Sequence, residues 1–216
     1  MQVKILKECG YEEAHIGLAL SFYDHKIPLF QCDDGEYFWT LERFEKMKKV
    51  AIHIANKQIP EDYETRNNLA YISAEQKFLE QIDTWIYIQA SRSWWIEMST
   101  YRVDTSTQRS STMHTLDKRE TVKEDFLDIT ILGLDAFNAC LRDYKNLNHI
   151  YYKDIEKLKC ALPEGFLSEG VFKTSYKTLK WILEQRDGHR LESWKIFNKE
   201  IYNQIEHPEF IKPIEN

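Results

Sequence analysis

Residues 92–114 combine aromatic, cationic and hydroxyl side chains in an order typical of a ligand pocket. Trp94 and Trp95 come first, and Arg102 and Arg109 follow within a run rich in serine and threonine. A guanidinium offers a planar fork to a phosphate or a carbonyl edge, and hydroxyl and backbone N–H groups can complete such a cage. The segment therefore indicates a pocket for a planar anionic ligand such as a nucleotide. The alternative interpretation is a solvated loop after a buried helix, with the two tryptophans in the core.

A second cationic segment lies toward the C-terminus. Residues 159–163 read Lys-Cys-Ala-Leu-Pro, and four positive charges follow over a short strand–helix unit, at Lys173, Lys177, Lys180 and Arg186. Such a concentration suits an anionic ligand, although a solvated helix face would carry the same residue types.

The composition restricts the class of protein. With 216 residues the chain can bury one sizeable core, and 43% hydrophobic with 30% charged residues is typical of a globular protein. The chain has only 7 glycines and 5 prolines, and this low content argues against disorder and against a turn-rich β architecture. The net charge of −6 argues against a general nucleic-acid binder, but it allows a local positive pocket for a small anion.

The spacing of the cysteines and the absence of several motifs exclude further classes of protein. Cys9, Cys32, Cys140 and Cys160 are widely spaced, which favours reduced thiols over a disulfide frame or a zinc site. No signal peptide and no membrane-spanning apolar run is found, so we expect a cytosolic protein. The GxGxxG, P-loop, HExxH and GxSxG patterns are all missing, so we expect no metal site and no familiar nucleotide cradle.

The spacing of apolar residues predicts a helix-rich α/β (α+β) protein with a small sheet. Helices are predicted over 12–23, 41–56, 75–82, 121–144, 148–158, 176–185 and 193–205, and strands over 3–6, 84–89 and 171–174. Capping boxes at 73–76 and 121–124 support two of the helix starts. The segments 24–38 and 57–72, and the donor-rich stretch after the tryptophan helix, are predicted to be loops. No linker divides the chain, so we expect one domain over residues 1–216 with a loose tail from about residue 207.

Both cationic segments together resemble the flavin-dependent thymidylate synthases. That family's signature is Arg-His-Arg, seven residues and then Ser; here Thr100-Tyr101-Arg102 is followed, at the same spacing, by Ser110. The family's later stretch has Arg-x-x-Leu-Pro, a strand, Asn-x-Arg and a helix that ends in an Arg. This chain has Lys159 before Leu162-Pro163, then Ser175-x-Lys177 and Arg186 in the same order. The resemblance covers roughly residues 84–205.

The resemblance implies the fold and the activity of that family. Its members are homotetramers with active sites at subunit interfaces. They use FAD in the reductive methylation of dUMP, with methylenetetrahydrofolate as carbon donor and NADPH as reductant. The flavin carries the difficult chemistry, so no protein nucleophile and no catalytic side chain is assigned.

The resemblance also implies roles for particular residues. Ser110 corresponds to the signature serine beside dUMP, Arg102 to the second signature arginine, and Arg186 to the arginine at the uracil edge. Together the implied nucleotide-binding residues are Glu97, Arg102, Arg109, Ser110, Lys159 and Arg186. The implied cofactor-binding residues are Tyr101, Ser175 and Lys177.

Several positions depart from the family pattern. Thr100 and Tyr101 stand where the signature has Arg and His, and Gln108, Thr112 and Ser175 replace an acid, an arginine and an asparagine. Arg109 and His114 offer compensating charge. No clear counterpart of the family's early flavin-binding segment is found; Lys77-Phe-Leu-Glu80 is the nearest candidate.

Three functions therefore stay open. The chain is predicted to be a flavin-dependent enzyme that methylates a pyrimidine nucleotide, most simply dUMP. The first alternative is a catalytically inactive protein that binds or sequesters a nucleotide on the same fold. The second is an interaction protein whose tryptophans serve only packing.

Overall fold

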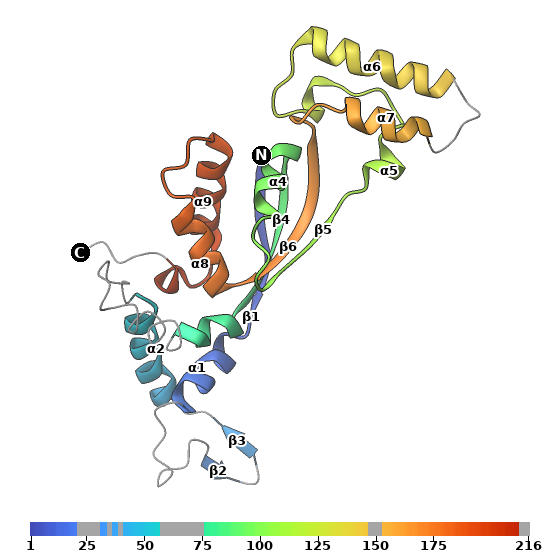
Figure 1. Ribbon diagram of the computed structural model, residues 1–216. Helices are drawn as coiled ribbons and strands as arrows, with labels where there is room; N and C mark the ends of the chain where they lie inside the picture. The colour runs from blue at the N-terminus through green and yellow to red at the C-terminus, as the bar shows by residue number, and fades with distance from the viewer. Residues whose placement is uncertain (21–30, 34–35, 39–40, 57–75, 147–152, 212–216) are drawn as a thin grey trace.

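A four-stranded antiparallel sheet in the order β1-β4-β6-β5 forms the centre of the molecule (Figure 1). The computed structural model describes residues 1–20, 31–33, 36–38, 41–56, 76–146 and 153–211. The strands run over β1 (Gln2–Cys9), β4 (Asp83–Ser91), β5 (Thr105–Arg109) and β6 (Leu167–Ser175). A separate hairpin joins β2 (Gln31–Asp33) and β3 (Glu36–Phe38).

The two central strands show why one face of the sheet is covered. In β4 the buried side chains of Ile86 and Ile88 alternate with the partly exposed Tyr87 and Gln89, and Phe172 is buried on the neighbouring β6. A period of two places all the buried residues on the same face. That face carries the core.

Helices surround the sheet on one face and at both ends (Figure 1). Helices α8 (Tyr176–Gln185), α9 (Glu192–Gln204) and the short α4 (Arg92–Met98) lie beside the sheet. At one end are α1 (Tyr11–Leu20), α2 (Leu41–Ala55) and the 3-10 helix η2 (Gln76–Gln81). At the other end are α5 (Thr112–Thr115), η3 (Lys123–Asp125), α6 (Ile131–Asn146) and α7 (Lys153–Ala161).

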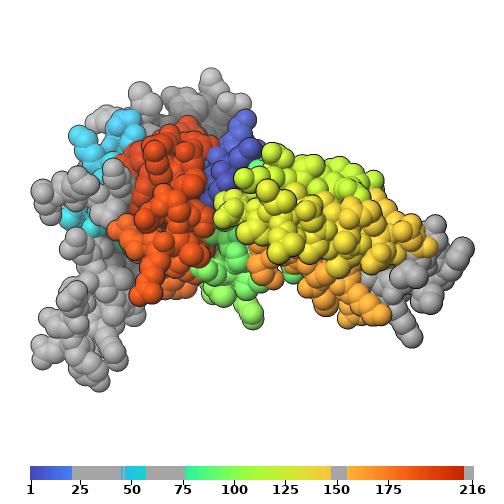
Figure 2. All heavy atoms as spheres, turned by 90° about the horizontal axis from the view of Figure 1, so that it is seen from above, coloured from blue at the N-terminus to red at the C-terminus, as the bar shows by residue number. Residues whose placement is uncertain are grey.

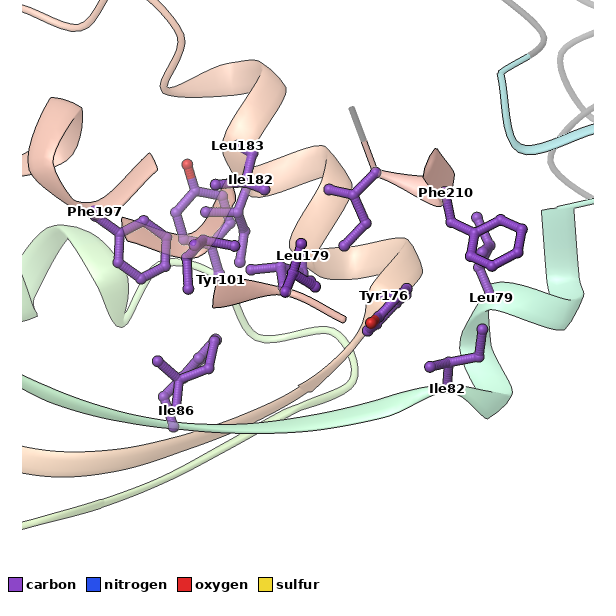
Figure 3. Close-up of a cluster of buried hydrophobic side chains, with 14 of the residues drawn as sticks. Leu79, Ile82, Ile86, Tyr101, Tyr176, Leu179, Ile182, Leu183, Phe197 and Phe210 are labelled. Carbon is purple, nitrogen blue, oxygen red and sulfur yellow. The ribbon is translucent and has the colours of Figure 1, made fainter. Parts of the chain in front are cut away.

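The buried residues form two separate clusters. In the larger one, Ile86 of the sheet faces Leu179 and Ile182 of α8 and Phe197 of α9 (Figure 3). The smaller one joins α6 and α7 and consists of Leu116, Phe126, Phe137, Leu141, Ile155, Leu158 and Leu162. Figure 2 shows this second cluster's helices as a lobe that extends from the rest of the molecule. We call this lobe the arm (residues 112–146 and 153–166).

The described part of the C-terminal segment, which ends at Ile211, is anchored, whereas a loose tail was predicted from about residue 207. Residues Pro208–Phe210 form the 3-10 helix η4, and the side chains of Phe210 and Ile211 are completely buried. Glu8 accepts hydrogen bonds from the hydroxyl of Tyr176 (2.9 Å) and from the backbone N–H of Glu206 (2.9 Å). Burial raises the pKa of the Glu8 carboxyl. This side chain therefore ties the first strand to α8 and to the C-terminal segment.

The predicted elements are confirmed in type for the most part, with three corrections. Strand β5 was predicted as loop, the predicted loop 24–38 contains β2 and β3, and the predicted helix 121–144 begins only at Ile131. Thr121 does not cap a helix, because its backbone N–H and its hydroxyl both donate to Oδ1 of Asn138 (2.9 and 2.8 Å). This buried contact ties residue 121 to the side of α6, and the chain forms the 3-10 helix η3 (Lys123–Asp125) before α6 begins.

The helix-rich α+β fold class is confirmed, while the single domain stays a prediction. The capping box at 73–76 and parts of the predicted helices 12–23 and 148–158 lie outside the described residues. Cys9, Cys140 and Cys160 are free thiols. None of the described helices is long and apolar enough to cross a membrane.

A pair of substitutions on β4 tests the assignment of the core face. Ile86→Ala should lower the free energy of unfolding by about 2–5 kcal/mol, because the side chain is fully buried beneath α8 and α9. Gln89→Ala, on the opposite face of the same strand, should change it by less than about 1 kcal/mol. Urea unfolding followed by tryptophan fluorescence measures both; equal losses would contradict the assignment.

Candidate functional site

Helix α4 and strand β5 hold the first cationic segment. The helix begins where the hydroxyl of Ser91 accepts the backbone N–H of Trp94 at 3.3 Å. Trp94 and Trp95 are almost completely buried, as predicted for the core. A turn containing Asp104, which has a positive φ of 53°, then leads into β5.

Strand β5 presents its donor-rich side chains at the edge of the sheet. Its backbone pairs with β6, and Arg109 lies opposite Gly170. A Cβ atom added at Gly170 would come within 3.0 Å of the side chains of both Arg109 and Trp95. The glycine therefore allows the Arg109 side chain to lie against the indole ring of Trp95, whose centroid is 4.8 Å from the guanidinium carbon.

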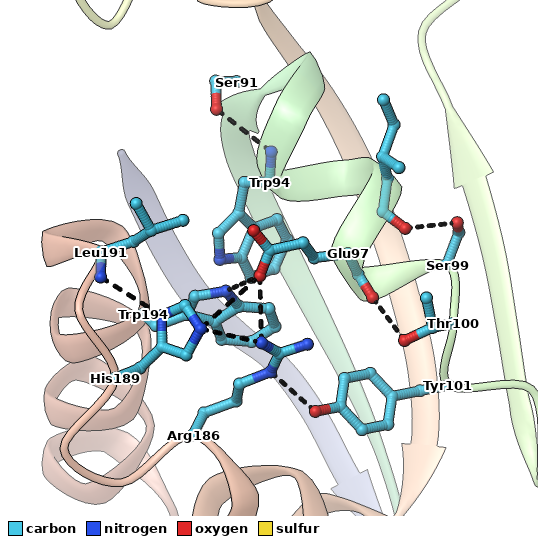
Figure 4. A network of polar contacts seen from close by, with 11 residues as sticks. Ser91, Trp94, Glu97, Ser99, Thr100, Tyr101, Arg186, His189, Leu191 and Trp194 are labelled. Atoms are coloured by element: carbon cyan, nitrogen blue, oxygen red, sulfur yellow. Dashed lines mark hydrogen bonds and ion pairs between the residues drawn. The ribbon is translucent and has the colours of Figure 1, made fainter.

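A network of polar contacts gathers around Arg186 at the end of α8 (Figure 4). Its Nε donates to the hydroxyl of Tyr101 (2.7 Å), and its Nη1 donates to Oε2 of Glu97 (3.0 Å). The same Oε2 accepts the indole N–H of Trp194 (2.8 Å), and Nε2 of His189 lies 3.0 Å from Nη1. The guanidinium also lies over the ring of Trp194, 4.3 Å from its centroid. The network thus joins α4, α8 and α9.

The network leaves two polar atoms available. The carboxylate of Glu97 compensates the charge of Arg186, whose side chain is only 17% exposed. In the part of the chain that the structure describes, neither Oε1 of Glu97 nor Nη2 of Arg186 has a hydrogen-bond partner. The ion pair therefore keeps one acceptor atom on Glu97 and one donor atom on Arg186.

A cavity of about 640 Å³ lies next to this network. Its lining residues come from η2, the turn before β5 and the first turns of α8: Glu80, Val103, Asp104, Lys177, Thr178 and Trp181. Trp181 is 48% exposed and packs edge-on against Tyr101, with 5.3 Å between the ring centroids. Because the hydroxyl of Tyr101 binds Arg186, this ring contact connects the lining of the cavity with the Arg186 network. The volume is in the range of small-molecule sites.

Charges in and around the cavity are nearly balanced. Lys177 donates to Glu80 (2.7 Å), and the ammonium of Lys173 lies 2.5 Å from Asp83 and 3.9 Å from Asp104. The lining therefore suits a planar ring beside Trp181 better than a group with several negative charges.

The structure brings only part of the predicted site together. Glu97, Tyr101 and Arg186 are in direct contact, and Lys177 lines the adjacent cavity. Ser175 is fully buried and caps α8 by accepting the N–H of Thr178 (3.4 Å).

The remaining predicted residues lie elsewhere. Arg102 is exposed, and Lys159 lies on α7 in the arm. Ser110 exchanges two hydrogen bonds with the backbone of Glu169, at 2.8 and 3.3 Å. These contacts place Ser110 beside β6, at the same edge as Arg109.

A row of three indole rings separates Arg109 from Arg186. The centroids of Trp95 and Trp94 are 5.3 Å apart, and those of Trp94 and Trp194 are 4.7 Å apart. Arg109 lies over the first ring of this row and Arg186 over the last. The two arginines, both predicted to bind nucleotide, are thus at opposite ends of the row.

Sequence reasoning missed three aromatic side chains of the site. Trp194 and His189 were not assigned to it, and Trp181 was included only in an amphipathic helix. The helical spacing of Trp181 relative to Lys177 was the available signal, because residues four apart lie on one face.

The arrangement of the sheet and its covering helices is similar to the fold of solved flavin-dependent thymidylate synthases. Two crystal structures of ThyX from Helicobacter pylori, both complexed with FAD and dUMP, match with a TM-score of 0.68 and 16% sequence identity. Each match covers 98% of this chain and 98% of the enzyme's chain. No protein-family model and no curated protein sequence matches the chain. The resemblance noted from the motifs is therefore confirmed at the level of the fold.

Substitution of Glu97 tests the role of the network in stability. Glu97→Ala removes the acceptor of Trp194 and the charge partner of Arg186, and should lower the free energy of unfolding by about 1–3 kcal/mol. Glu97→Gln should cost less, because its amide oxygen can still accept the indole N–H. The control is Glu192→Gln at an exposed ion pair with Lys195, which should change stability by less than about 1 kcal/mol. Chemical denaturation of the three variants measures the differences; a cost for Glu97→Ala no larger than the control would contradict the role.

Proposed function

We propose that the protein binds a pyrimidine nucleotide at the Arg186 network and a flavin in the adjacent cavity, and catalyses the reductive methylation of dUMP. The observation that carries the proposal is the contact of Glu97, Tyr101 and Arg186 beside a ligand-sized cavity, on the fold of flavin-dependent thymidylate synthases. Methylenetetrahydrofolate and NADPH are the proposed co-substrates.

The available atoms of the network fit the edge of a pyrimidine base. Oε1 of Glu97 can accept an N–H, and Nη2 of Arg186 can donate to a neighbouring carbonyl oxygen or ring nitrogen. Uracil presents such a pair at N3–H and an adjacent carbonyl. Because the ion pair is already formed, the site offers a neutral edge to a neutral base.

The cavity fits the ring system of a flavin. Trp181 would contact the ring, and Lys177 would meet a ring oxygen after exchanging its bond to Glu80. When bound, the flavin supplies hydride transfer, and the protein positions the reactants. Tyr101 and Trp181 would exclude water between the two ligands, because both rings stand at the boundary.

One observation favours the second candidate, a nucleotide-binding protein without turnover. Thr100 and Tyr101 replace the Arg and His of the family signature, and both side chains are used inside the chain. The hydroxyl of Thr100 donates to the carbonyl oxygen of Glu97 (2.7 Å), and that of Tyr101 accepts from Arg186. Neither side chain is free to take over the missing charges.

Ligand titrations test the proposal. The purified protein should bind FAD, seen by quenching of flavin fluorescence, and dUMP, seen by calorimetry. Lys177→Ala should weaken FAD binding about 10-fold, from the loss of a charge-assisted hydrogen bond. Lys195→Ala, an exposed lysine of α9, is the matched control and should have no effect. Formation of dTMP from the full set of substrates would distinguish an enzyme from a protein that only binds nucleotide. If the protein binds neither FAD nor dUMP, both proposals are wrong.

We also propose that the protein is a homotetramer in which a nucleotide lies between copies. The row of Trp95, Trp94 and Trp194 separates Arg109 from Arg186, so a nucleotide that contacts both arginines must lie between two chains.

Light scattering during gel filtration tests the proposed assembly. The expected particle mass is four times the chain mass of 25.9 kDa, at micromolar protein concentration. A particle with the mass of one chain that still binds dUMP would contradict the shared site.

A further inference from the structure

A tight turn places the imidazole of His189 beside the guanidinium of Arg186 (Figure 4). Arg186 follows the last residue of α8, and the backbone N–H of His189 donates to its carbonyl oxygen at 3.3 Å. Gly188, between them, has a φ of 64°, a conformation that glycine adopts without steric cost. The imidazole lies edge-on to Trp194, with 6.1 Å between the ring centroids, and is only 26% exposed. The turn and α9 together thus hold the ring next to the arginine.

Both ring nitrogens of His189 face hydrogen-bond donors. The backbone N–H of Leu191, the residue before α9, points at Nδ1 from 3.2 Å. Nη1 of Arg186 lies 3.0 Å from Nε2. A neutral imidazole has one acceptor nitrogen and one N–H, so it can accept from only one of these two donors, and an imidazolium accepts from neither. The position of the proton on His189 therefore decides which donor is held.

The guanidinium is the donor that needs the imidazole more. Leu191 is exposed, so water can accept its N–H, whereas the side chain of Arg186 is only 17% exposed and carries a charge. This difference favours the tautomer with the proton on Nδ1 and the acceptor at Nε2. In that tautomer Nη1 uses one hydrogen for Glu97 and the other for His189, and Nε donates to Tyr101. Nη2 alone then remains for a ligand.

Protonation of His189 would remove this acceptor and add a positive charge beside Arg186. Two charged side chains meet at the ring: Arg186 from the end of α8 and Glu97 from α4, whose Oε2 is 3.9 Å from Nε2. From α9 come the indole of Trp194 and the N–H of Leu191. Among the described residues, Glu97 is the only carboxylate within ion-pair distance of either cation. Two cations that repel each other would thus compete for one carboxylate.

We propose that neutral His189 is a positioning residue for Arg186, and that its protonation loosens the arginine and weakens binding of the base. The imidazole acts through Nη1, which it holds so that Nη2 keeps its direction. The inference deepens the proposed function, because the base that Arg186 would bind is the pyrimidine named there. Histidine as a residue type changes its charge between about pH 5 and pH 8. Binding should therefore be strongest at the alkaline end of this range.

The first test is calorimetry with deoxyuridine, which lacks the phosphate whose own titration at about pH 6 would obscure the result. The wild type should bind it about 10-fold more weakly at about pH 5 than at about pH 8, because only molecules with neutral His189 are competent. His189→Gln has an amide oxygen that can accept from Nη1 and does not titrate, so its affinity should be the same at both pH values. His53→Gln, at an exposed histidine of α2, is the matched control and should keep the wild-type pH dependence.

A second substitution separates this role from a purely structural one at the start of α9. The shorter side chain of His189→Asn can still accept the N–H of Leu191 in place of Nδ1, but it does not extend to Nη1 of Arg186. It should bind deoxyuridine about 10-fold more weakly than His189→Gln at both pH values, because a charge-assisted hydrogen bond is lost. Equal affinities of the two variants, or a wild-type pH dependence in His189→Gln, would overturn the proposal.

A measurement without ligand distinguishes failure of this inference from failure of the proposed function. Two-bond ¹H–¹⁵N NMR spectra of protein labelled on histidine show which ring nitrogen carries the proton, and the signal of His189 is identified by its absence from His189→Gln. At about pH 8 we expect the proton on Nδ1. A proton on Nε2 would overturn the inference even if dUMP binds. If neither dUMP nor deoxyuridine binds while the proton is on Nδ1, the proposed function fails and the contact of His189 with Arg186 stands.

Discussion

The packing of α4 between the sheet and α9 is the constraint on which the rest of the site depends. Trp95 faces the sheet, where its indole N–H donates to the carbonyl oxygen of Ser168 (3.0 Å), and Trp94 packs against Trp194 and Phe197 of α9. Large buried aromatic side chains fix the distance between the elements that they separate, since a close-packed interior does not deform easily. The helix therefore sets where Glu97, Tyr101 and Arg109 lie relative to α8. A change at either tryptophan would move both ends of the site.

Most of the helices and the core were predictable, because periodic apolar residues determine which face of an element is buried. Ile86 and Ile88 show this, since they belong to the strand predicted over 84–89 and are completely buried. Strand β5 was not predictable in the same way. It is an edge strand held by backbone hydrogen bonds to β6, and its exposed side chains carry no apolar alternation. The ion pair between Glu97 and Arg186 could not be predicted from the sequence either. The two residues are 89 positions apart, and residue types alone do not show which distant side chains come into contact. The motif spacing brought both residues into the candidate set, but not their contact.

The structure shows which contacts are made by the residues that differ from the family signature. Tyr101 replaces a histidine, yet its ring is buried between Trp181 and Trp194 and its hydroxyl binds Arg186. An aromatic residue at this position thus fills the core and orients the arginine at the same time. Ser175, in place of an asparagine, caps α8 and fixes where Lys177 and Trp181 point. Compared with the family pattern that the sequence resembles, these residues supply packing and capping contacts but fewer positive charges.

The distribution of compensated and uncompensated charge gives the site its polarity. Arg186 is neutralised by Glu97, so this end presents hydrogen-bonding atoms without net charge. At the other end, Arg109 has no carboxylate within ion-pair distance among the described residues, and burial and the charge of Arg92 lower its pKa, so this end keeps excess positive charge. A mononucleotide has the same division, with an uncharged base at one end and a phosphate at the other. For the nucleotide that we propose as ligand, such complementarity would determine orientation more than it raises affinity, because a reversed ligand would place its phosphate against the closed ion pair and leave Arg109 without a partner.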